Sequence, residues 1–162
     1  MDELSSHAQV IAAILTRRKE TIAVAESSAG GLISAALLAV PGASAYFLGG
    51  AVAYTRTSRE AFLQIPASAL AGITPSTEAY ALLLARTARE RLSATWGLAE
   101  TGTAGPTGSR YGFNAGHSAV AIAGPMEKSL VIETGQGDRA VNMQAFAAAA
   151  LALLARALAE RA

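Results

Sequence analysis

Four short segments of the sequence combine glycine with hydroxyl or charged side chains, and they are the places where chemistry could be concentrated. The first, residues 25–31, reads Ala-Glu-Ser-Ser-Ala-Gly-Gly. Its glycines allow a sharp turn that aims amide hydrogens at the start of a helix, where phosphate or carboxylate groups bind. The alternative is structural, because Ser27 or Ser28 can cap the helix while the glycines only form the turn. The segment matches neither a Walker phosphate loop nor the Gly-x-Gly-x-x-Gly pattern.

The second segment, residues 42–47, places Ser44 in a turn directly before an expected strand. Its hydroxyl could face a cleft there, and Tyr54 and Arg59 could return to it only through the fold. A serine in a turn is usually structural. The sequence also lacks the Gly-x-Ser-x-Gly elbow of α/β-hydrolases, so spacing alone does not make Ser44 a nucleophile.

The third segment, residues 101–108, reads Thr-Gly-Thr-Ala-Gly-Pro-Thr-Gly and begins a long loop that could close over a ligand. The fourth, residues 137–139, is Gly-Asp-Arg at the start of the last expected helix. Arg139 could hold a phosphate through a bidentate contact. Equally, Asp138 could be a helix cap and Arg139 a solvated charge in the first turn.

The spacing of apolar residues indicates the elements that must position these segments. Leu4, Ala8 and Ile11 recur at helical steps, whereas residues 21–25 form a short run rich in β-branched side chains, which is typical of a strand. Helices are expected at 4–19, 32–40, 58–64, 74–91 and from 139 onward, and strands at 21–25, 46–54, 96–101, 117–123 and 129–134.

Two local signals refine these bounds. Thr74 can cap a helix that has Pro75 at its first position, where no amide hydrogen is needed. The Gly49-Gly50 pair inside an expected strand indicates a bulge or a close backbone approach.

The alternation of helices and strands predicts an α/β fold, a three-layer α/β/α sandwich with a mostly parallel mixed sheet and one antiparallel edge pair. The edge pair is the hairpin that turns at Gly124-Pro125. Residues 1–162 have the size of a single domain with one core. In such folds ligands bind beyond the carboxyl ends of the strands, and both glycine-rich turns leave strand ends.

Composition excludes several classes of function. The chain has no cysteine, so it has neither a disulfide nor a thiolate nucleophile. Its net charge of +1 and its scattered arginines argue against binding of nucleic acid. His7 and His117 have no partner at metal-ligand spacing, so we expect no dedicated metal site. We find no uninterrupted apolar run of about 18 residues and no signal-like start, and therefore expect a cytoplasmic protein without membrane association.

Taken together and in this order, the four segments resemble the CinA C-terminal domain family, known in its stand-alone form as nicotinamide-nucleotide amidohydrolase. The family patterns Ala-Glu-Ser-Cys-Thr-Gly-Gly, Pro/Thr-Gly-Ala-Ser-x-x-Phe, Thr-Gly-Ile-Ala-Gly-Pro-x-Gly and Gly-Asp-Arg are similar to residues 25–31, 41–47, 101–108 and 137–139. The resemblance covers nearly the whole chain. It implies hydrolysis of nicotinamide mononucleotide to nicotinate mononucleotide and ammonia, within pyridine-nucleotide recycling and without a cofactor.

The resemblance also assigns roles to residues. Ser44 takes the position of the attacking serine, Tyr54 that of an assisting tyrosine, and Arg59 that of a general-base lysine. A desolvated lysine can lose its proton near neutral pH, whereas a guanidinium stays protonated in proteins, so the chain departs from the family at its proton acceptor. The implied substrate-binding residues are Glu26, Ser27, Ser28, Gly30, Gly31, Thr101, Gly102, Ala104, Gly105, Pro106 and Arg139.

Three hypotheses follow from these observations. A working amidohydrolase uses Ser44 as nucleophile, with Glu26, Tyr54 or a water taking its proton and Arg59 stabilising charge. A non-catalytic nucleotide-binding or interaction domain keeps the glycine-rich turns after losing the base. A related hydrolase acts on a different small molecule, because residues 109–115 depart from the family pattern beside the expected pocket. In each case we expect a homo-oligomer, with a dimer favoured, since small α/β domains with Ala-rich helices often bury one face against a second copy.

Overall fold

The computed structural model describes residues 2–161, and its centre is a five-stranded sheet with the order β2-β1-β3-β4-β5. The strands are β1 (Ile22–Glu26), β2 (Phe47–Val52), β3 (Trp96–Thr103), β4 (His117–Ala123) and β5 (Lys128–Glu133). β1 pairs in parallel with β2 and β3, whereas β4 runs antiparallel to both β3 and β5. The predicted mixed sheet is confirmed, and its antiparallel part includes the β3–β4 pairing in addition to the expected edge pair.

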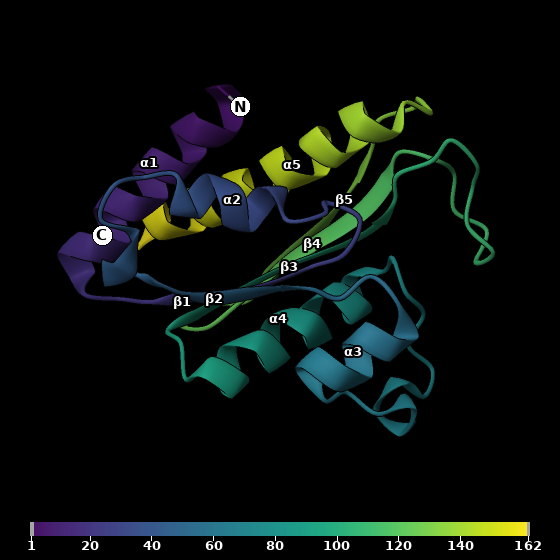
Figure 1. Cartoon of the computed structure of the whole chain (residues 1–162), viewed down its shortest axis with the longest axis horizontal. Helices are drawn as coiled ribbons and strands as arrows, with labels where there is room; N and C mark the ends of the chain where they lie inside the picture. The colour runs from purple at the N-terminus through teal and green to yellow at the C-terminus, as the bar shows by residue number, and fades with distance from the viewer. Residues whose placement is uncertain (1, 162) are drawn as a thin grey trace.

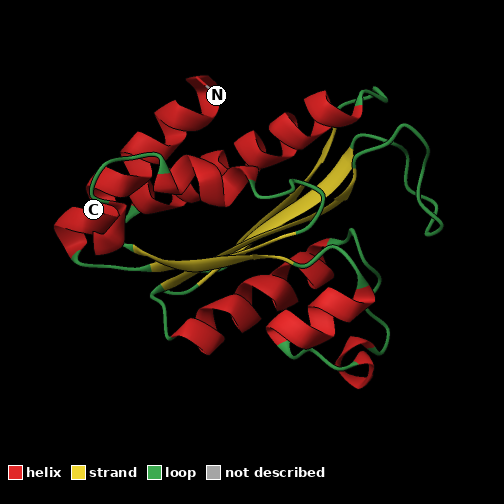
Figure 2. Cartoon of the chain, in the orientation of Figure 1, coloured by secondary structure: helices red, strands yellow, loops and turns green. Residues whose placement is uncertain are grey.

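Helices cover both faces of this sheet, which gives the three layers seen in Figures 1 and 2. The helices are α1 (Asp2–Arg18), α2 (Leu32–Leu38), α3 (Arg56–Leu63), α4 (Glu78–Leu92) and α5 (Arg139–Glu160), with short 3₁₀ helices η1 (Ala43–Ala45) and η2 (Ala67–Leu70). α1, α2 and α5 lie on one face, and α3 and α4 lie on the other. The predicted α/β/α sandwich is therefore confirmed.

The two faces of the sheet bury side chains of different size, because successive residues of a strand point to opposite faces. The layer of α1, α2 and α5 packs on the large residues Ile22, Val24, Trp96 and Leu98, and α4 packs on the small residues Ala23, Ala25 and Ala99. Small residues let α4 approach closely. A Cβ added to Gly97 would lie 2.0 Å from the carbonyl oxygen of Ala85, so only glycine fits at this point of β3.

One predicted helix start is corrected. The helix expected from Thr74 begins at Glu78, and its N-cap is Thr77, whose hydroxyl oxygen accepts the N–H of Tyr80 at 3.3 Å. Ser76 has a φ of 66°, which interrupts the helical backbone before that cap. A residue in this left-handed region cannot belong to the helix, so Thr74 and Pro75 form a turn instead.

The irregularity predicted in the second strand lies beside its glycine pair. Ile22 pairs with Phe47 and Ala23 with Gly49, so Leu48 is the additional residue in β2. The close approach is also present, since a Cβ on Gly50 would lie 2.2 Å from the Ser34 hydroxyl oxygen of α2.

α5 is the long apolar helix of the first layer. Among the described residues it is the one helix with the length and composition to cross a membrane, but 56% of its most apolar stretch is buried inside the fold. Phe146, Leu151 and Leu154 are fully buried there. This burial is typical of a core helix.

Candidate functional site

A cavity of about 740 Å³ lies at the carboxyl ends of β1, β2 and β3. Ser27 and Ser28 border it after β1, Tyr54 after β2, and Thr103 at the end of β3. α3 and the loop between β3 and β4 complete its walls. Its volume falls in the range of roughly 300–1,000 Å³ that is usual for small-molecule sites. The cavity therefore lies at the edge of the sheet where the strand pattern predicts a ligand.

Four arginines line this cavity, whose lining includes no aspartate or glutamate. They are Arg56, Arg59, Arg110 and Arg139. Arg59 is only 7% exposed; its Nη1 donates to the Tyr80 hydroxyl at 3.5 Å, and its Nε has no hydrogen-bond partner within residues 2–161. Thr103 Oγ1, also on the cavity wall, is a second buried polar atom without such a partner in that range. A buried charge without a counter-ion is costly, so the cavity favours an anionic ligand.

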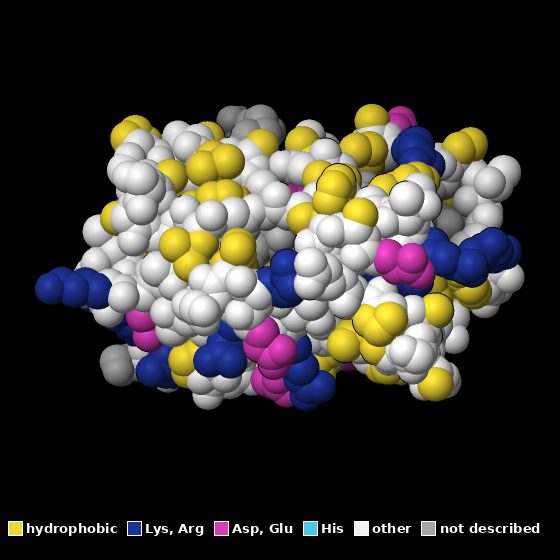
Figure 3. Space-filling model, turned by 60° about the horizontal axis from the view of Figure 1, so that its bottom comes forward, with side chains coloured by type: hydrophobic (Ala, Val, Ile, Leu, Met, Phe, Trp, Pro, Cys, Tyr) yellow, Lys and Arg dark blue, Asp and Glu magenta, His cyan; other side chains and the backbone are white. Residues whose placement is uncertain are grey.

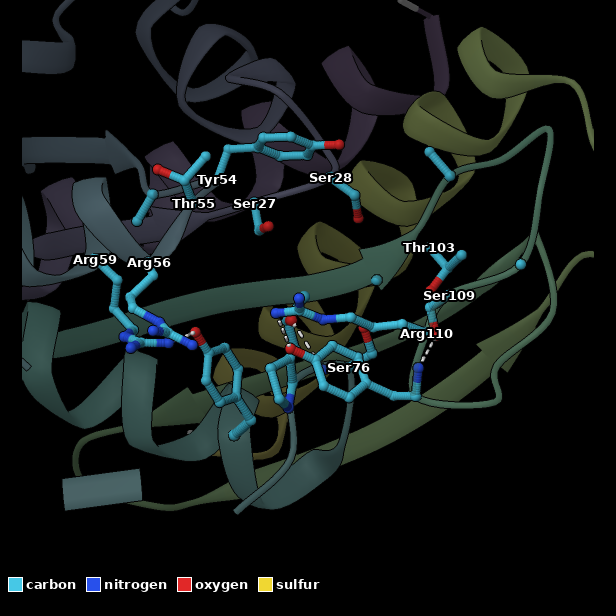
Figure 4. Close-up of a pocket in the computed structure, with 18 of the residues that line it drawn as sticks. Ser27, Ser28, Tyr54, Thr55, Arg56, Arg59, Ser76, Thr103, Ser109 and Arg110 are labelled. Atoms are coloured by element: carbon cyan, nitrogen blue, oxygen red, sulfur yellow. Dashed lines mark hydrogen bonds between the residues drawn. The ribbon is translucent and has the colours of Figure 1, made fainter. Parts of the chain in front are cut away.

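Figure 4 shows how these cations surround the space. Arg56 and Arg59 lie together at one side, and Arg110 extends toward the middle from the opposite side. Ser27 and Ser28 lie on a further wall, in the upper part of the view. On the face of the protein seen in Figure 3, lysine and arginine side chains occupy separate spots among acidic and hydrophobic ones. The cavity is therefore a local concentration of arginine in a chain whose net charge is only +1.

Glu100 of β3 holds the turn at residues 27–29 by hydrogen bonds. Its Oε1 accepts the N–H groups of Ser27 at 3.1 Å and of Ala29 at 2.8 Å. Its Oε2 accepts the hydroxyls of Ser28 and of Ser118 on β4, the latter at 3.1 Å. The side chain is fully buried, and this burial raises the pKa of the Glu100 carboxyl above its ordinary value although the hydrogen bonds act to lower it.

Glu26, the last residue of β1, binds the N-terminus of α2. Its Oε1 accepts the N–H groups of Gly31 and Ile33 at 2.9 and 3.1 Å. Its Oε2 accepts the N–H and the hydroxyl of Ser34 at 2.9 and 2.8 Å. A carboxylate is favourable here because a helix N-terminus carries unpaired N–H groups and the positive end of the helix dipole. Glu26 does not line the cavity, and its contacts are with the start of α2.

Arg139, the first residue of α5, connects two of the sequence segments at the cavity rim. Its Nη1 donates to the Gly105 carbonyl at 2.5 Å and its Nη2 to the Tyr54 hydroxyl at 3.0 Å. Asp138 is the N-cap of α5, which confirms the capping alternative for this residue. Arg139 is thus a cation at the cavity that also fixes its rim.

The loop between β3 and β4 has internal structure. The Ser109 hydroxyl oxygen accepts the N–H groups of Tyr111 and Phe113, each at 3.2 Å. The Phe113 ring stacks on His117 of β4, with ring centroids 4.1 Å apart. These contacts hold the part of the loop that presents Arg110 to the cavity.

Ser44 lies outside this cavity. It is exposed and belongs to η1, which precedes β2, whereas Tyr54 and Arg59 follow that strand. Strand residues rise roughly 3.3 Å each, so the length of β2 puts Ser44 on the order of 20 Å from Tyr54. The predicted grouping of Ser44 with Tyr54 and Arg59 is therefore not formed, because an extended strand separates the serine from the other two.

Most of the remaining predicted residues do meet at the cavity. Those that line it are Ser27, Ser28, Tyr54, Arg59, Thr101, Gly102, Ala104, Gly105 and Arg139, whereas Glu26, Gly30, Gly31 and Pro106 do not. Sequence reasoning missed Arg56, Arg110 and Glu100. The signals were present, since two of these are charges beside segments already singled out, and Glu100 is a carboxylate directly after the apolar run Trp96–Ala99 of an expected strand.

Comparison with known sequences gives a consistent result. A family model described as "CinA C-terminal domain" matches residues 4–158. A CinA-like protein from Anaeromyxobacter sp. (strain Fw109-5) is 42% identical over 149 residues, which cover 92% of this chain and 36% of that protein. A putative competence-damage inducible protein from Desulforamulus reducens is 44% identical over 117 residues, which cover 72% of this chain and 28% of that protein. The chain therefore spans about a third of the length of these curated relatives.

Solved structures agree with this result. A competence-damaged protein (CinA) superfamily protein from Klebsiella pneumoniae 700603 superposes with a TM-score of 0.89 at 25% identity, covering 97% of this chain and 98% of that one. A competence/damage inducible protein from Agrobacterium tumefaciens gives a TM-score of 0.87 at 28% identity, covering 96% and 95%. Both similarities extend over almost the whole fold.

Proposed function

Because the chain belongs to the family of CinA C-terminal domains, we propose that it is a nicotinamide-nucleotide amidohydrolase. It binds nicotinamide mononucleotide by its phosphate, hydrolyses the carboxamide and releases nicotinate mononucleotide and ammonia. The observation that carries this proposal is the presence of four arginines and the two serines of the turn after β1 in one cavity that no carboxylate lines. Such a cavity suits a small molecule with a phosphate at one end and an electrophilic carbonyl at the other.

The nucleophile in this proposal comes from the turn after β1, because Ser27 and Ser28 line the cavity and Ser44 does not. The serine oxygen bonds to the carboxamide carbon, the C–N bond breaks as ammonia leaves, and water then cleaves the resulting ester. Arg59 stabilises the negative charge that develops on the carbonyl oxygen, since it is a buried cation on the same cavity. Arg110 and Arg139 bind the phosphate.

A second function, nucleotide binding without turnover, is favoured by the guanidinium at residue 59. Arg59 cannot accept a proton from a serine, because a guanidinium stays protonated in proteins. The cavity would then retain its affinity for an anionic nucleotide without the ability to cleave it.

The test is to incubate the purified chain with nicotinamide mononucleotide and measure ammonia, while calorimetry measures binding. We expect ammonia release, and we expect Arg110→Met to weaken binding by at least tenfold. Arg17→Met is the matched control, because it removes the same charge at an exposed position on α1, outside the cavity. Binding without ammonia release supports the second function. Failure to bind, or equal binding by Arg110→Met and Arg17→Met, contradicts both.

A further inference from the structure

The buried carboxylate of Glu100 lies directly behind a cavity-lining hydroxyl. Ser28 borders the cavity and donates its hydroxyl hydrogen bond to Glu100 Oε2. Glu100 itself is fully buried and does not line the cavity, so Ser28 lies between the carboxylate and the space that a ligand would occupy. The pair therefore has the arrangement of a nucleophile with a base behind it.

The surroundings of Glu100 supply several hydrogen-bond donors to its carboxylate. Four donors serve the carboxylate, namely two backbone N–H groups of the turn on Oε1 and the hydroxyls of Ser28 and Ser118 on Oε2. A carboxylate accepts hydrogen bonds at all of these positions, whereas a protonated carboxyl would turn one oxygen into a donor. No cation takes part in these contacts, so the charge of Glu100 is not neutralised by an arginine of the cavity.

We propose that Ser28 and Glu100 form a catalytic dyad, in which Glu100 is the proton acceptor that Arg59 cannot be. This inference rests on the proposed amide hydrolysis and adds the identity of its nucleophile and base. It selects Ser28 over its neighbour Ser27, because only the Ser28 hydroxyl contacts the carboxylate, while Ser27 contacts it through its backbone N–H.

Each half of the reaction is balanced by the transfer of one proton, which comes from Ser28 in the first half and from water in the second. Ser28 Oγ forms a bond to the carboxamide carbon as its proton passes to Glu100 Oε2. The C–N bond then breaks, and the proton passes from Glu100 to the leaving nitrogen, which departs as ammonia. Water attacks the acyl ester, its proton passes to Glu100, and the ester oxygen takes that proton as Ser28 is restored. No metal ion or redox partner is needed at any step.

Burial suits Glu100 to this task. Desolvation raises the pKa of its carboxyl above the ordinary value, the hydrogen bonds from Ser28 and the backbone oppose this, and the nearby Glu26 charge adds to the increase. A carboxylate with a raised pKa is a stronger base than an exposed one, and a base is most effective when its pKa approaches the working pH.

The first experiment asks whether Ser28 is nucleophilic, without assuming the substrate. The wild-type chain is treated with an alkyl fluorophosphonate, which loses fluoride when a serine oxygen bonds to its phosphorus, and the adduct is located by peptide mass spectrometry. We expect an adduct on Ser28, no labelling in Ser28→Ala, and a rate at least tenfold lower in Glu100→Gln. An adduct on Ser27, no adduct, or an equal rate in Glu100→Gln overturns the dyad.

The second experiment measures ammonia release from nicotinamide mononucleotide. Glu100→Gln should lower kcat by about 10²–10⁴-fold, as loss of a general base does, with KM changed less than about threefold. Ser118→Ala is the matched control, because it removes one hydrogen bond from the same carboxylate and leaves the base in place; it should retain at least a fifth of wild-type kcat. If Glu100→Gln does not fold, Glu100→Asp, which keeps the charge but withdraws it from Ser28, should show the same reduction in labelling rate.

The two proposals fail in different ways. Ammonia release that survives in Ser28→Ala overturns the dyad and leaves the amidohydrolase proposal standing. Glu100-dependent labelling of Ser28 without ammonia release supports the dyad and overturns nicotinamide mononucleotide as its substrate. Neither labelling nor release overturns both.

Discussion

The turn after β1 and the turn before β2 are similar in sequence and opposite in position. Each has a serine close to glycine, and each begins a helix with a left-handed glycine as N-cap, Gly31 with a φ of 98° and Gly42 with a φ of 87°. Because β1 and β2 are parallel neighbours, a turn that follows one strand and a turn that precedes the other lie at opposite ends of the sheet. Only the first turn meets the arginine-lined cavity. Strand direction, rather than the local pattern, therefore decides which serine lies at the cavity.

The two turns also differ in what holds them. The turn after β1 donates backbone N–H groups to two buried carboxylates, Glu26 and Glu100. The turn before β2 is held by Tyr46, which is buried and donates its hydroxyl to the Leu37 carbonyl of α2. Around Gly42 a Cβ would meet no atom within 4 Å. The first turn is thus held by two buried carboxylates, whereas the second is anchored by one aromatic side chain.

The largest expected effect comes from removing the hydroxyls of each turn in parallel. The double variant Ser27→Ala/Ser28→Ala should lower ammonia release by about 10³-fold or more, because it removes both hydroxyls of the turn that supplies the proposed nucleophile. Ser44→Ala should remain within about twofold of wild type. Both are measured as kcat/KM for nicotinamide mononucleotide. A large loss in Ser44→Ala would return the nucleophile to the turn before β2.

The next effect is on stability. Glu26→Ala should lower the free energy of unfolding by about 3 kcal/mol, because it leaves several N–H groups at the start of α2 without an acceptor. Urea unfolding measures it as a shift in midpoint at constant m. Glu60→Ala, at an exposed position on α3, is the control and should change the value by less than about 0.5 kcal/mol. Equal midpoints for the two variants would show that Glu26 does not hold the helix.

A smaller effect on stability is expected from substitution of the two N-cap glycines, Gly31 and Gly42. Gly31→Ala and Gly42→Ala should each cost about 1–2 kcal/mol of stability, because alanine is strained at a positive φ. Only Gly31→Ala should also lower kcat, since it displaces the serines of the cavity. Unfolding curves and ammonia release measured on the same preparations separate the two effects. Equal kcat in both variants would argue that the turn after β1 has no part in catalysis.

The smallest effect is the pH dependence of stability. The pKa of the Glu100 carboxyl is raised in the folded chain, so the folded state binds more protons than the unfolded state above about pH 4.3. The stability linked to Glu100 is therefore fully present below that pH and is lost as the pH rises through the folded pKa. The Tm of wild type relative to Glu100→Gln should fall over this window, and Ser118→Ala should keep the dependence. A constant Tm difference would contradict the raised pKa.

Much of the fold follows from the sequence because its elements have clear periodicity. The start of α1 repeats at helical steps, and the run at residues 21–25 and the glycines after it place β1 and its turn correctly. The rule that ligands bind beyond the carboxyl ends of strands then predicts where the cavity lies. The start of α4 is less accurate, because Thr74-Pro75 and Thr77 are both plausible caps and only the backbone at Ser76 distinguishes them.

The site is harder to predict because its contacts join segments far apart in the sequence. Ser28 and Glu100 are 72 residues apart, and the pairing of β1 with β3 brings them together. Arg139 meets Tyr54 across 85 residues. A motif assigns a role to Ser44 without any knowledge of strand direction, which is why this role is not supported by the geometry.

The hydrogen bonds of Glu100 also bear on how this chain can change over generations. A carboxylate at this point of β3 without hydroxyls at Ser28 and Ser118 would be a buried charge with two fewer donors. The Ser28 hydroxyl beside an aliphatic side chain would lose its acceptor in turn, whereas Ser118 would keep the Thr101 carbonyl. Substitutions at the three positions are therefore coupled, and a lineage that gains or loses the glutamate is expected to exchange its two serines at nearly the same time.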